Sequence, residues 1–180
     1  MKKSLFKKIE IPGEVEVEVE KATIFVKGQE GEIKKTFKIG KVDIKKENNK
    51  IIIGNAKATK REKKIINTLF SHIKNMILGV QKKFEYKVKI CFSHFPFTVN
   101  VSEDKVEIKN FLGEKVPRIL HIPKGLEIKV DKESITITSV DKELAGRVAS
   151  DFEKLTKIRG RDKRIFQDGI YITNKAGREI

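Results

Sequence analysis

The residues with the clearest chemical potential lie near the end of the chain, where cations gather at close spacing. The cations of this stretch are Lys157, Arg159, Arg161, Lys163, Arg164 and Lys175. Two glycines, Gly160 and Gly169, flank the densest charge, and only Asp162 and Asp168 oppose it. A guanidinium presents a planar set of donors that matches phosphate oxygens. The spacing therefore predicts phosphate binding, with a merely solvated basic surface as the alternative.

Bulky apolar residues follow these cations and set the expected shape of the stretch. They are Phe166, Ile170, Tyr171 and Ile172. A core strand is excluded because too many cations would have to be buried beside them. A disordered tail is disfavoured because it would expose too many large apolar groups. We expect a basic loop held by a short apolar strand.

Composition favours a polyanionic partner for the whole chain. The 180 residues include 40 Lys and Arg against 25 Asp and Glu, a formal charge of +15. Such a balance attracts nucleic acid first and an acidic membrane surface second. The single cysteine, Cys91, excludes an intramolecular disulfide. That usage, and the lack of an apolar run of signal-peptide or membrane-span length, predict a cytoplasmic protein without a membrane partner.

Alternation and helical periodicity divide the chain into two similar halves. In the first half, residues 1–8 are expected to be frayed, and Thr59 with Glu62 predicts a capped helix. Strands are expected at 14–20, 22–27, 33–39, 42–46 and 50–53. In the second half, strands are expected at 85–92, 99–101, 105–109, 119–122, 126–130 and 134–138. A second helix is expected from Asp141 to about Thr156.

The halves also repeat in sequence. A shift of about eighty residues lays Ile24–Lys27 on Val106–Lys109, and Ile51 and Ile53 on Ile135 and Ile137. The predicted fold is α+β: two tandem, duplicated domains, each an antiparallel sheet with one main helix, plus a basic C-terminal extension. The expected domains are 1–82 and 83–180. The extension has no counterpart in the first half, and such additions commonly carry function.

Catalytic and metal chemistry is poorly supported. Cys91, His72, His94 and His121 lack the paired spacing of metal ligands. A Cys91–His94 nucleophile is disfavoured because Cys91 falls in an expected strand. Asp162 or Asp168 could serve a magnesium-dependent nuclease, which is kept as an alternative. Asp168–Gly169 is better interpreted as a turn whose carboxylate bonds backbone amides or orients an arginine.

The C-terminal residues resemble a known signature. Arg161, Arg164, Phe166, Asp168–Gly169, Ile170, Tyr171, Ile172 and Lys175 are similar to the end of ribosomal protein six of the large subunit, in its archaeal and eukaryotic branch. The resemblance extends over essentially the whole chain. One departure is Lys154, where the family often has Gln. The resemblance implies a structural, non-enzymatic constituent that needs no cofactor or small-molecule substrate.

The resemblance also implies a site and partners. The partners would be large-subunit ribosomal RNA and ribosomal proteins at the base of the factor-binding stalk, close to the sarcin-ricin region. Phe166, Asp168 and Gly169 would anchor the site structurally. The expected RNA contacts are Lys157, Arg159, Arg161, Lys163, Arg164, Gln167, Tyr171, Lys175 and His94. The loop of His94 to Phe97 is either a second contact or a hydrophobic cluster that closes the domain.

Two rival functions remain beside this hypothesis. One is another basic nucleic-acid-binding protein or the nuclease above. The other is a protein-interaction module that uses the acidic strand 14–20 or the apolar loop at Phe95. If about six cations meet phosphates, the logarithmic salt slope of RNA binding should be on the order of −4.

Overall fold

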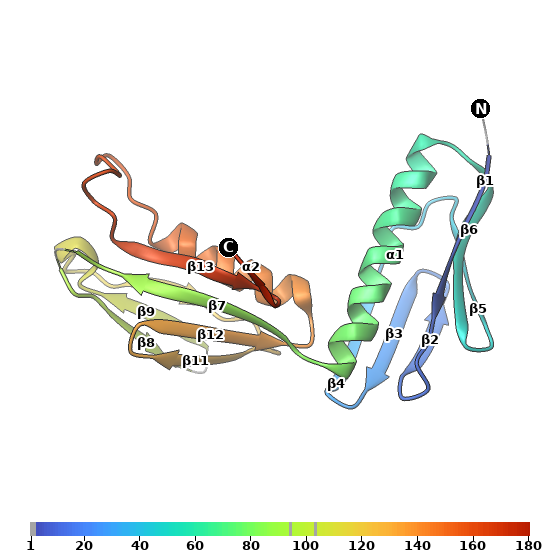
Figure 1. The fold of residues 1–180 in the computed structure, drawn as a ribbon, viewed down its shortest axis with the longest axis horizontal. Helices are drawn as coiled ribbons and strands as arrows, with labels where there is room; N and C mark the ends of the chain where they lie inside the picture. Colours follow the sequence, from blue (N-terminus) through green and yellow to red (C-terminus); the bar gives the residue numbers. More distant parts are fainter. Residues whose placement is uncertain (1–2, 94, 103) are drawn as a thin grey trace. The chain divides into compact units, whose positions relative to one another are not determined.

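The computed structural model describes residues 3–93, 95–102 and 104–180. It divides into two compact units, Met1–Lys83 and Phe84–Ile180, each with one long helix and antiparallel sheets (Figure 1). The α+β class predicted from the sequence is confirmed. His94, expected to contact RNA, lies outside the described residues.

The first unit contains two three-stranded antiparallel sheets. Its sheet orders are β1-β6-β5 and β2-β3-β4. The bounds are β1 Lys3–Glu10, β2 Glu16–Glu20, β3 Thr23–Gly28, β4 Gly31–Thr36, β5 Asp43–Glu47 and β6 Lys50–Ala58. Strand β6 continues well beyond the expected end at Ile53, and Ile51 and Ile53 are fully buried. Alternating burial of one face therefore sets the register of this sheet.

The first ten residues correct the sequence analysis. They were expected to fray, whereas β1 pairs antiparallel with β6 from Lys3 to Glu10. Ile9 is buried, and the Lys7 ammonium lies 4.6 Å from the centre of the Phe70 ring. Lysine can lay its aliphatic stem on apolar surface while its charge stays on an aromatic face or in water. An inward-facing lysine therefore hid the alternation of this strand.

Helix α1, Lys60–Gln81, begins as predicted from its capping residues. The Thr59 side chain accepts from the Arg61 amide, and the Glu62 carboxylate accepts from the Thr59 amide at 2.8 Å. This reciprocal arrangement satisfies amides that have no partner within the helix. The buried stripe comprises Ile66, Leu69, Ile73, Met76, Ile77 and Val80. The helix packs these residues against β3, β4, β6 and β1.

The second unit repeats this plan with different lengths. Its sheets have the orders β10-β9-β8 and β11-β12-β7-β13-β14. The strands are β7 Phe84–Cys91, β8 Thr98–Val101, β9 Lys105–Lys109, β10 Arg118–His121, β11 Glu127–Asp131, β12 Ser134–Ser139, β13 Gly169–Lys175 and β14 Arg178–Glu179. A short 3-10 helix, η1 Phe111–Gly113, occupies the turn expected at Leu112 and Gly113. Helix α2 spans Lys142–Leu155 and begins at its cap, Asp141.

The two units match strand for strand. The order β1-β6-β5 corresponds to β7-β12-β11, and β2-β3-β4 corresponds to β8-β9-β10. The predicted equivalence of Ile24–Lys27 and Val106–Lys109 places β3 on β9. Strands β13 and β14 have no partner in this correspondence. They follow α2 in the chain, and β13 pairs with β7 (Figure 1).

The core of the second unit lies between α2 and the strands. Val88, Ile135, Ile137 and Phe152 are fully buried in it, and Ile170 of β13 joins them. The added strand is thus part of the core rather than a loose appendage. Within the described ranges, neither helix is long and apolar enough to cross a membrane.

Candidate nucleic-acid interface

The basic loop, defined here as residues 156–168, connects the end of α2 to the start of β13. Its cations Lys157, Arg159, Arg161, Lys163 and Arg164 are all exposed. Lys175 is exposed too, but it lies at the far end of β13, opposite Tyr86. At roughly 3.3 Å per residue, that is about 20 Å from Gly169. The structure therefore gathers five of the six predicted cations and separates Lys175 from them.

A buried threonine fixes the first end of the basic loop. The Thr156 hydroxyl donates to the Phe152 carbonyl at 3.1 Å and accepts from the Ile170 amide at 2.9 Å. One side chain thereby joins the last turn of α2 to the start of β13. Ile158 is also buried and packs into the core. Neither residue had been identified as part of the site, because their partners are distant in sequence.

A buried carboxylate fixes the second end. Asp168 is only 1% exposed, and its Oδ1 accepts from the Ser93 backbone amide and, at 3.0 Å, from the Ser93 hydroxyl. The predicted bond to a backbone amide is present, although the amide lies across the sheet and Gly169 begins β13 instead of completing a turn. Charged hydrogen bonds of this kind are stronger than neutral ones. Asp168 therefore ties the basic loop to the segment that follows β7.

An ion pair shapes the tip of the loop. The Arg164 guanidinium contacts the Asp162 carboxylate at 2.7–3.2 Å, and the Arg164 amide bonds the same group at 2.9 Å. The Asp162 carbonyl also accepts from the Phe166 amide at 2.9 Å, which closes a tight turn. The hydrogen bonds from Arg164 lower the pKa of Asp162 and raise the pKa of Arg164. The carboxylate thus orients an arginine whose side chain is 89% exposed.

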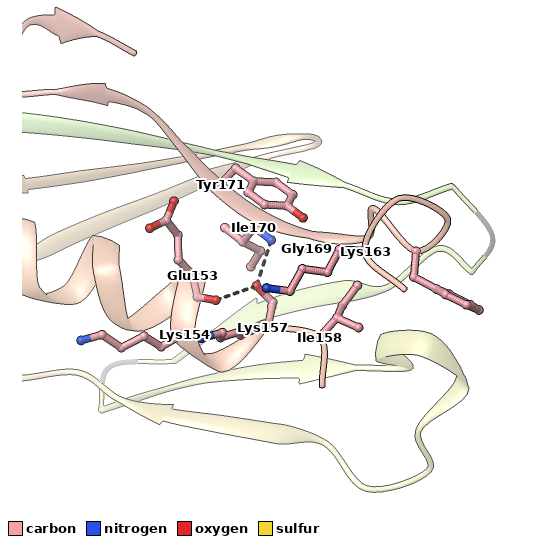
Figure 2. Close-up of a pocket in the computed structure, with 10 residues that line it drawn as sticks. Glu153, Lys154, Lys157, Ile158, Lys163, Gly169, Ile170 and Tyr171 are labelled. Atoms are coloured by element: carbon pink, nitrogen blue, oxygen red, sulfur yellow. Dashed lines mark hydrogen bonds between the residues drawn. The ribbon is translucent and has the colours of Figure 1, made fainter. Parts of the chain in front are cut away.

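An aromatic ring supports a second arginine. The Arg161 guanidinium carbon lies 4.9 Å from the centre of the Phe166 ring, a cation–π arrangement. Phe166 is half-buried and lines a cavity of about 300 Å³ under the loop. Figure 2 shows Lys163 extending into this cavity, with Glu153, Lys154 and Lys157 approaching from the end of α2. Within the described residues, Lys157, Arg159 and Lys163 have no ion pair, which leaves their donors available to an anion.

One cation of this surface was missed by the sequence analysis. Arg118, at the start of β10, contacts both oxygens of Glu114, its Nε at 2.8 Å, and donates to the Leu155 carbonyl at the end of α2. Its guanidinium also lies 4.3 Å from the Phe111 ring centre. The hydrogen bond from Arg118 lowers the pKa of Glu114. Spacing of four residues between Glu114 and Arg118 was the only local signal.

Arg118 belongs to a second cavity beside the loop. This cavity has a volume of about 480 Å³, and Glu114 is its only lining carboxylate among the described residues. Its cations are Arg118, Lys154, Lys157, Arg159 and Arg161. The C-terminal end of a helix carries partial negative charge, which favours cations gathering there. Lys154, the departure from the family pattern, adds to this cationic surface.

Glu153 holds the strand at an irregular point. Its Oε1 accepts from the Ile172 amide at 3.0 Å, where the pairing of β13 with β7 shifts register after Ile172. Without this carboxylate, a part-buried amide at the bulge would lack a partner. Glu153 therefore stabilises the strand that carries the loop, and the sequence offered no signal for it.

The loop that follows β7 combines the two roles left open by the sequence. Phe97 is buried, with ring centres 6.2 Å from Phe92 and 5.3 Å from Phe111, as expected for a closing hydrophobic cluster. Phe95 is 52% exposed, and His94 lies outside the described part of the chain. The hydrophobic-cluster interpretation thus applies to Phe97, while Phe95 remains on the surface.

The arrangement offers no catalytic constellation. Asp162 is held by Arg164, and Asp168 is buried under Ser93. In residues 3–93, 95–102 and 104–180, no three His, Cys, Asp or Glu side chains gather as metal ligands would. What the site does offer is a set of exposed donors on a loop fixed at both ends. Fold and site together define a non-catalytic class: a duplicated α+β scaffold with an added cationic loop.

Comparison with known proteins identifies the family. The family model described as Ribosomal protein L6 matches residues 11–83 and 95–169, one segment in each half of the chain. The chain belongs to the ribosomal protein L6 family. The resemblance found in the sequence is therefore confirmed, as is the prediction that the chain is not an enzyme.

Named relatives cover almost the whole chain. Each is called large ribosomal subunit protein uL6. The relative from Methanococcus vannielii is 42% identical over 96% of this chain and 94% of its own length. That from Methanobrevibacter smithii is 43% identical, over 93% and 94%. That from Sulfurisphaera tokodaii is 42% identical, over 95% and 92%.

Proposed function

We propose that this chain is a structural constituent of the large ribosomal subunit in the cytoplasm and binds the ribosomal RNA of that subunit through the basic loop. The observation that carries the proposal is a row of five exposed cations between two buried anchors, Thr156 and Asp168. Family membership supplies the class of RNA. The loop supplies a rigid place for its phosphates.

The mechanism is charge neutralisation in a fixed geometry. Arg161 is supported by Phe166 and Arg164 by Asp162, so both guanidinium groups are oriented before an anion arrives. Pre-oriented donors lose less conformational entropy on binding. Recognition then depends on RNA shape, because side chains cannot enter the deep groove of A-form RNA. Gln167 and Tyr171, at the end of the loop, add polar and aromatic contacts.

The position within the subunit is part of the same proposal. We place the loop near the base of the factor-binding stalk and the sarcin-ricin region, with neighbouring ribosomal proteins as further partners. Lys175 and His94 are retained as RNA contacts outside the loop. Lys175 would meet a separate phosphate because it lies at the far end of β13. With five cations on the loop, the expected salt slope of its contribution is on the order of −3.5.

The test is a salt-titrated binding measurement with Arg161 and Arg164 both replaced by Ala. Each lost charged hydrogen bond costs about 1.5–3 kcal/mol, so affinity for large-subunit ribosomal RNA should fall about 100-fold or more. Circular dichroism should show an unchanged fold, since both side chains are exposed. An unrelated structured RNA of equal length serves as the specificity control. Unchanged affinity in the double variant would reject the loop as the site.

A further inference from the structure

A third cavity lies next to the basic loop and has a different character. Its volume is about 350 Å³, and its lining comes from the end of β7 and the start of β13. The lining residues are Cys91, Phe92, Ser93, Gln167 and Tyr171. Phe92 is 48% exposed and Tyr171 is 46% exposed, so both rings are accessible. The volume falls in the range of small-molecule sites, roughly 300–1,000 Å³.

The Tyr171 ring is held in place by a glycine and a hydrogen bond. A Cβ on Gly169 would lie 3.1 Å from the ring, so the ring covers the backbone at a position where only glycine leaves room. The Tyr171 hydroxyl donates to the Gln167 carbonyl at 3.2 Å. The ring therefore lies back along β13, over the residue opposite Cys91. A ring fixed this way can receive a flat ligand without losing side-chain freedom.

The Phe92 ring is fixed from beneath. It meets Phe97 edge to face at 6.2 Å, and Phe97 is buried against Phe111. Ser93, the next residue, is bound to the buried Asp168. Phe92 is therefore carried by the same segment that Asp168 ties to the basic loop. The two aromatic rings and the loop form one connected surface.

Cations and polar groups surround this aromatic cavity. Gln167 belongs to the basic loop, and its Nε2 donates to the Arg164 carbonyl at 3.3 Å. Exposed Lys89 stands directly opposite Tyr171 in the sheet, so their Cβ atoms are about 5 Å apart. A ligand on the aromatic rings would thus be flanked by positive charge on two sides. The single carboxylate of this neighbourhood, among the described residues, is the buried Asp168.

We propose that the aromatic cavity receives an unstacked nucleobase of the RNA whose phosphates meet the basic loop. Unpaired RNA bases stack on Tyr and Phe side chains, while adjacent phosphates need cations. The inference rests on the proposed function and adds a base-binding subsite to it. Charge complementarity selects a nucleotide over an apolar peptide, because Lys89 and the loop cations frame the rings.

The first experiment separates ring stacking from simple apolar contact. Phe92→Leu keeps apolar bulk without a π face, and it should weaken binding to large-subunit ribosomal RNA about tenfold. Phe92→Trp restores a stacking face and should bind within about twofold of the wild type. Phe95→Leu is the matched control, an exposed ring of the same loop that does not line the cavity. Equal losses in Phe92→Leu and Phe95→Leu, or no loss in either, would overturn the subsite.

The second experiment uses the one cysteine of the chain as a reporter. Cys91 lines the cavity and is partly exposed, so its alkylation by iodoacetamide reports on access. Saturating ribosomal RNA should slow this reaction in the wild type, and much less in Phe92→Leu bound to the same RNA. Bound RNA that leaves the Cys91 rate unchanged would reject the subsite while the proposed function stands. No RNA binding by the wild type would reject the proposed function itself.

Discussion

The first strand of each unit has a different set of neighbours. In the first unit β1 pairs only with β6 and forms the edge of its sheet, within the described part of the chain. In the second unit β7 pairs with β12 on one side and with β13 on the other. The added strand thus occupies the edge that the first unit leaves open. An unpaired edge presents free backbone donors and acceptors, so it is the natural place to add a strand.

The helices of the two units end differently for the same reason. Helix α1 ends at Gln81, and the next strand begins at Phe84. Helix α2 ends at Leu155, and the basic loop intervenes before β13 begins at Gly169. The comparison teaches that a binding element was added to a repeat without altering its core plan. The loop becomes rigid because both its ends are bonded to elements that the repeat already had.

The largest expected effect tests whether the added loop, and not overall charge, binds RNA. Reversing Arg159, Arg161 and Lys163 to Glu should weaken RNA binding at least about 100-fold, because three donors to phosphate become acceptors. The matched variant reverses exposed Lys60, Lys63 and Lys64 on α1 of the first unit and should change affinity by less than about threefold. Filter binding at physiological salt measures both. Similar losses in the two variants would show that net charge alone is responsible.

The second prediction concerns the anchor that the first unit lacks. Asp168→Ala removes the acceptor for the Ser93 amide, and the free energy of unfolding of the second unit should fall by about 1–3 kcal/mol. Hydrogen exchange resolved by residue should show the loss in β7 and β13 and none in β1 and β6. Asp168→Asn keeps an acceptor oxygen and should lose less. An equal loss in both units would contradict the anchoring role.

The third prediction compares the two helix ends. Thr156→Val keeps the shape of the side chain but removes the acceptor for the Ile170 amide, at a cost of about 1 kcal/mol. Urea denaturation measures it, with Thr156→Ser as the control that keeps the hydroxyl. At the end of α1 the corresponding cap, Lys82, only donates its amide to Leu78. Lys82→Ala should therefore leave stability nearly unchanged.

The smallest effect is a difference in pH and salt response between two carboxyl groups. A hydrogen bond from Thr59 lowers the pKa of Glu62 in the first unit, and one from Arg118 lowers the pKa of Glu114 in the second. In both cases the contribution to stability is present above the ordinary pKa and is lost as pH falls through the lowered pKa. Only the Glu114 partner is charged, so added salt should raise the Glu114 pKa more. Carboxyl NMR titration measures this, and Arg118→Gln should bring the Glu114 pKa back toward its ordinary value.

Much of the fold could be predicted from local pattern. Alternation along Tyr86, Val88 and Ile90 indicated β7, and the Thr59–Glu62 pair indicated where α1 begins. The duplication followed because each strand of one half has an equivalent in the other. The opening strand β1 was missed because Lys7 takes an inward position normally held by an apolar residue. Its packing on Phe70 depends on a residue more than sixty positions away.

The candidate site was predictable in composition and not in geometry. Spacing located the five loop cations, since they are adjacent in sequence. It could not separate Lys175 from them, because the direction of β13 is a tertiary property. Arg118 was missed for the opposite reason, since β10 brings it to the end of α2 from a distant segment. The anchors Thr156 and Asp168 are short polar residues whose roles depend on burial, which only the packed structure reveals.

The pairing of β7 with β13 also orders events during synthesis. Every strand and the helix of the first unit are contiguous within the first 83 residues, so that unit can fold while the rest of the chain is still being made. The second unit begins with a strand whose partner arrives nearly last, with Cys91 facing Gly169. Contacts between residues so far apart in sequence form slowly. The cationic loop therefore acquires its fixed shape only near the end of synthesis, which delays capture of polyanions by the unfinished chain.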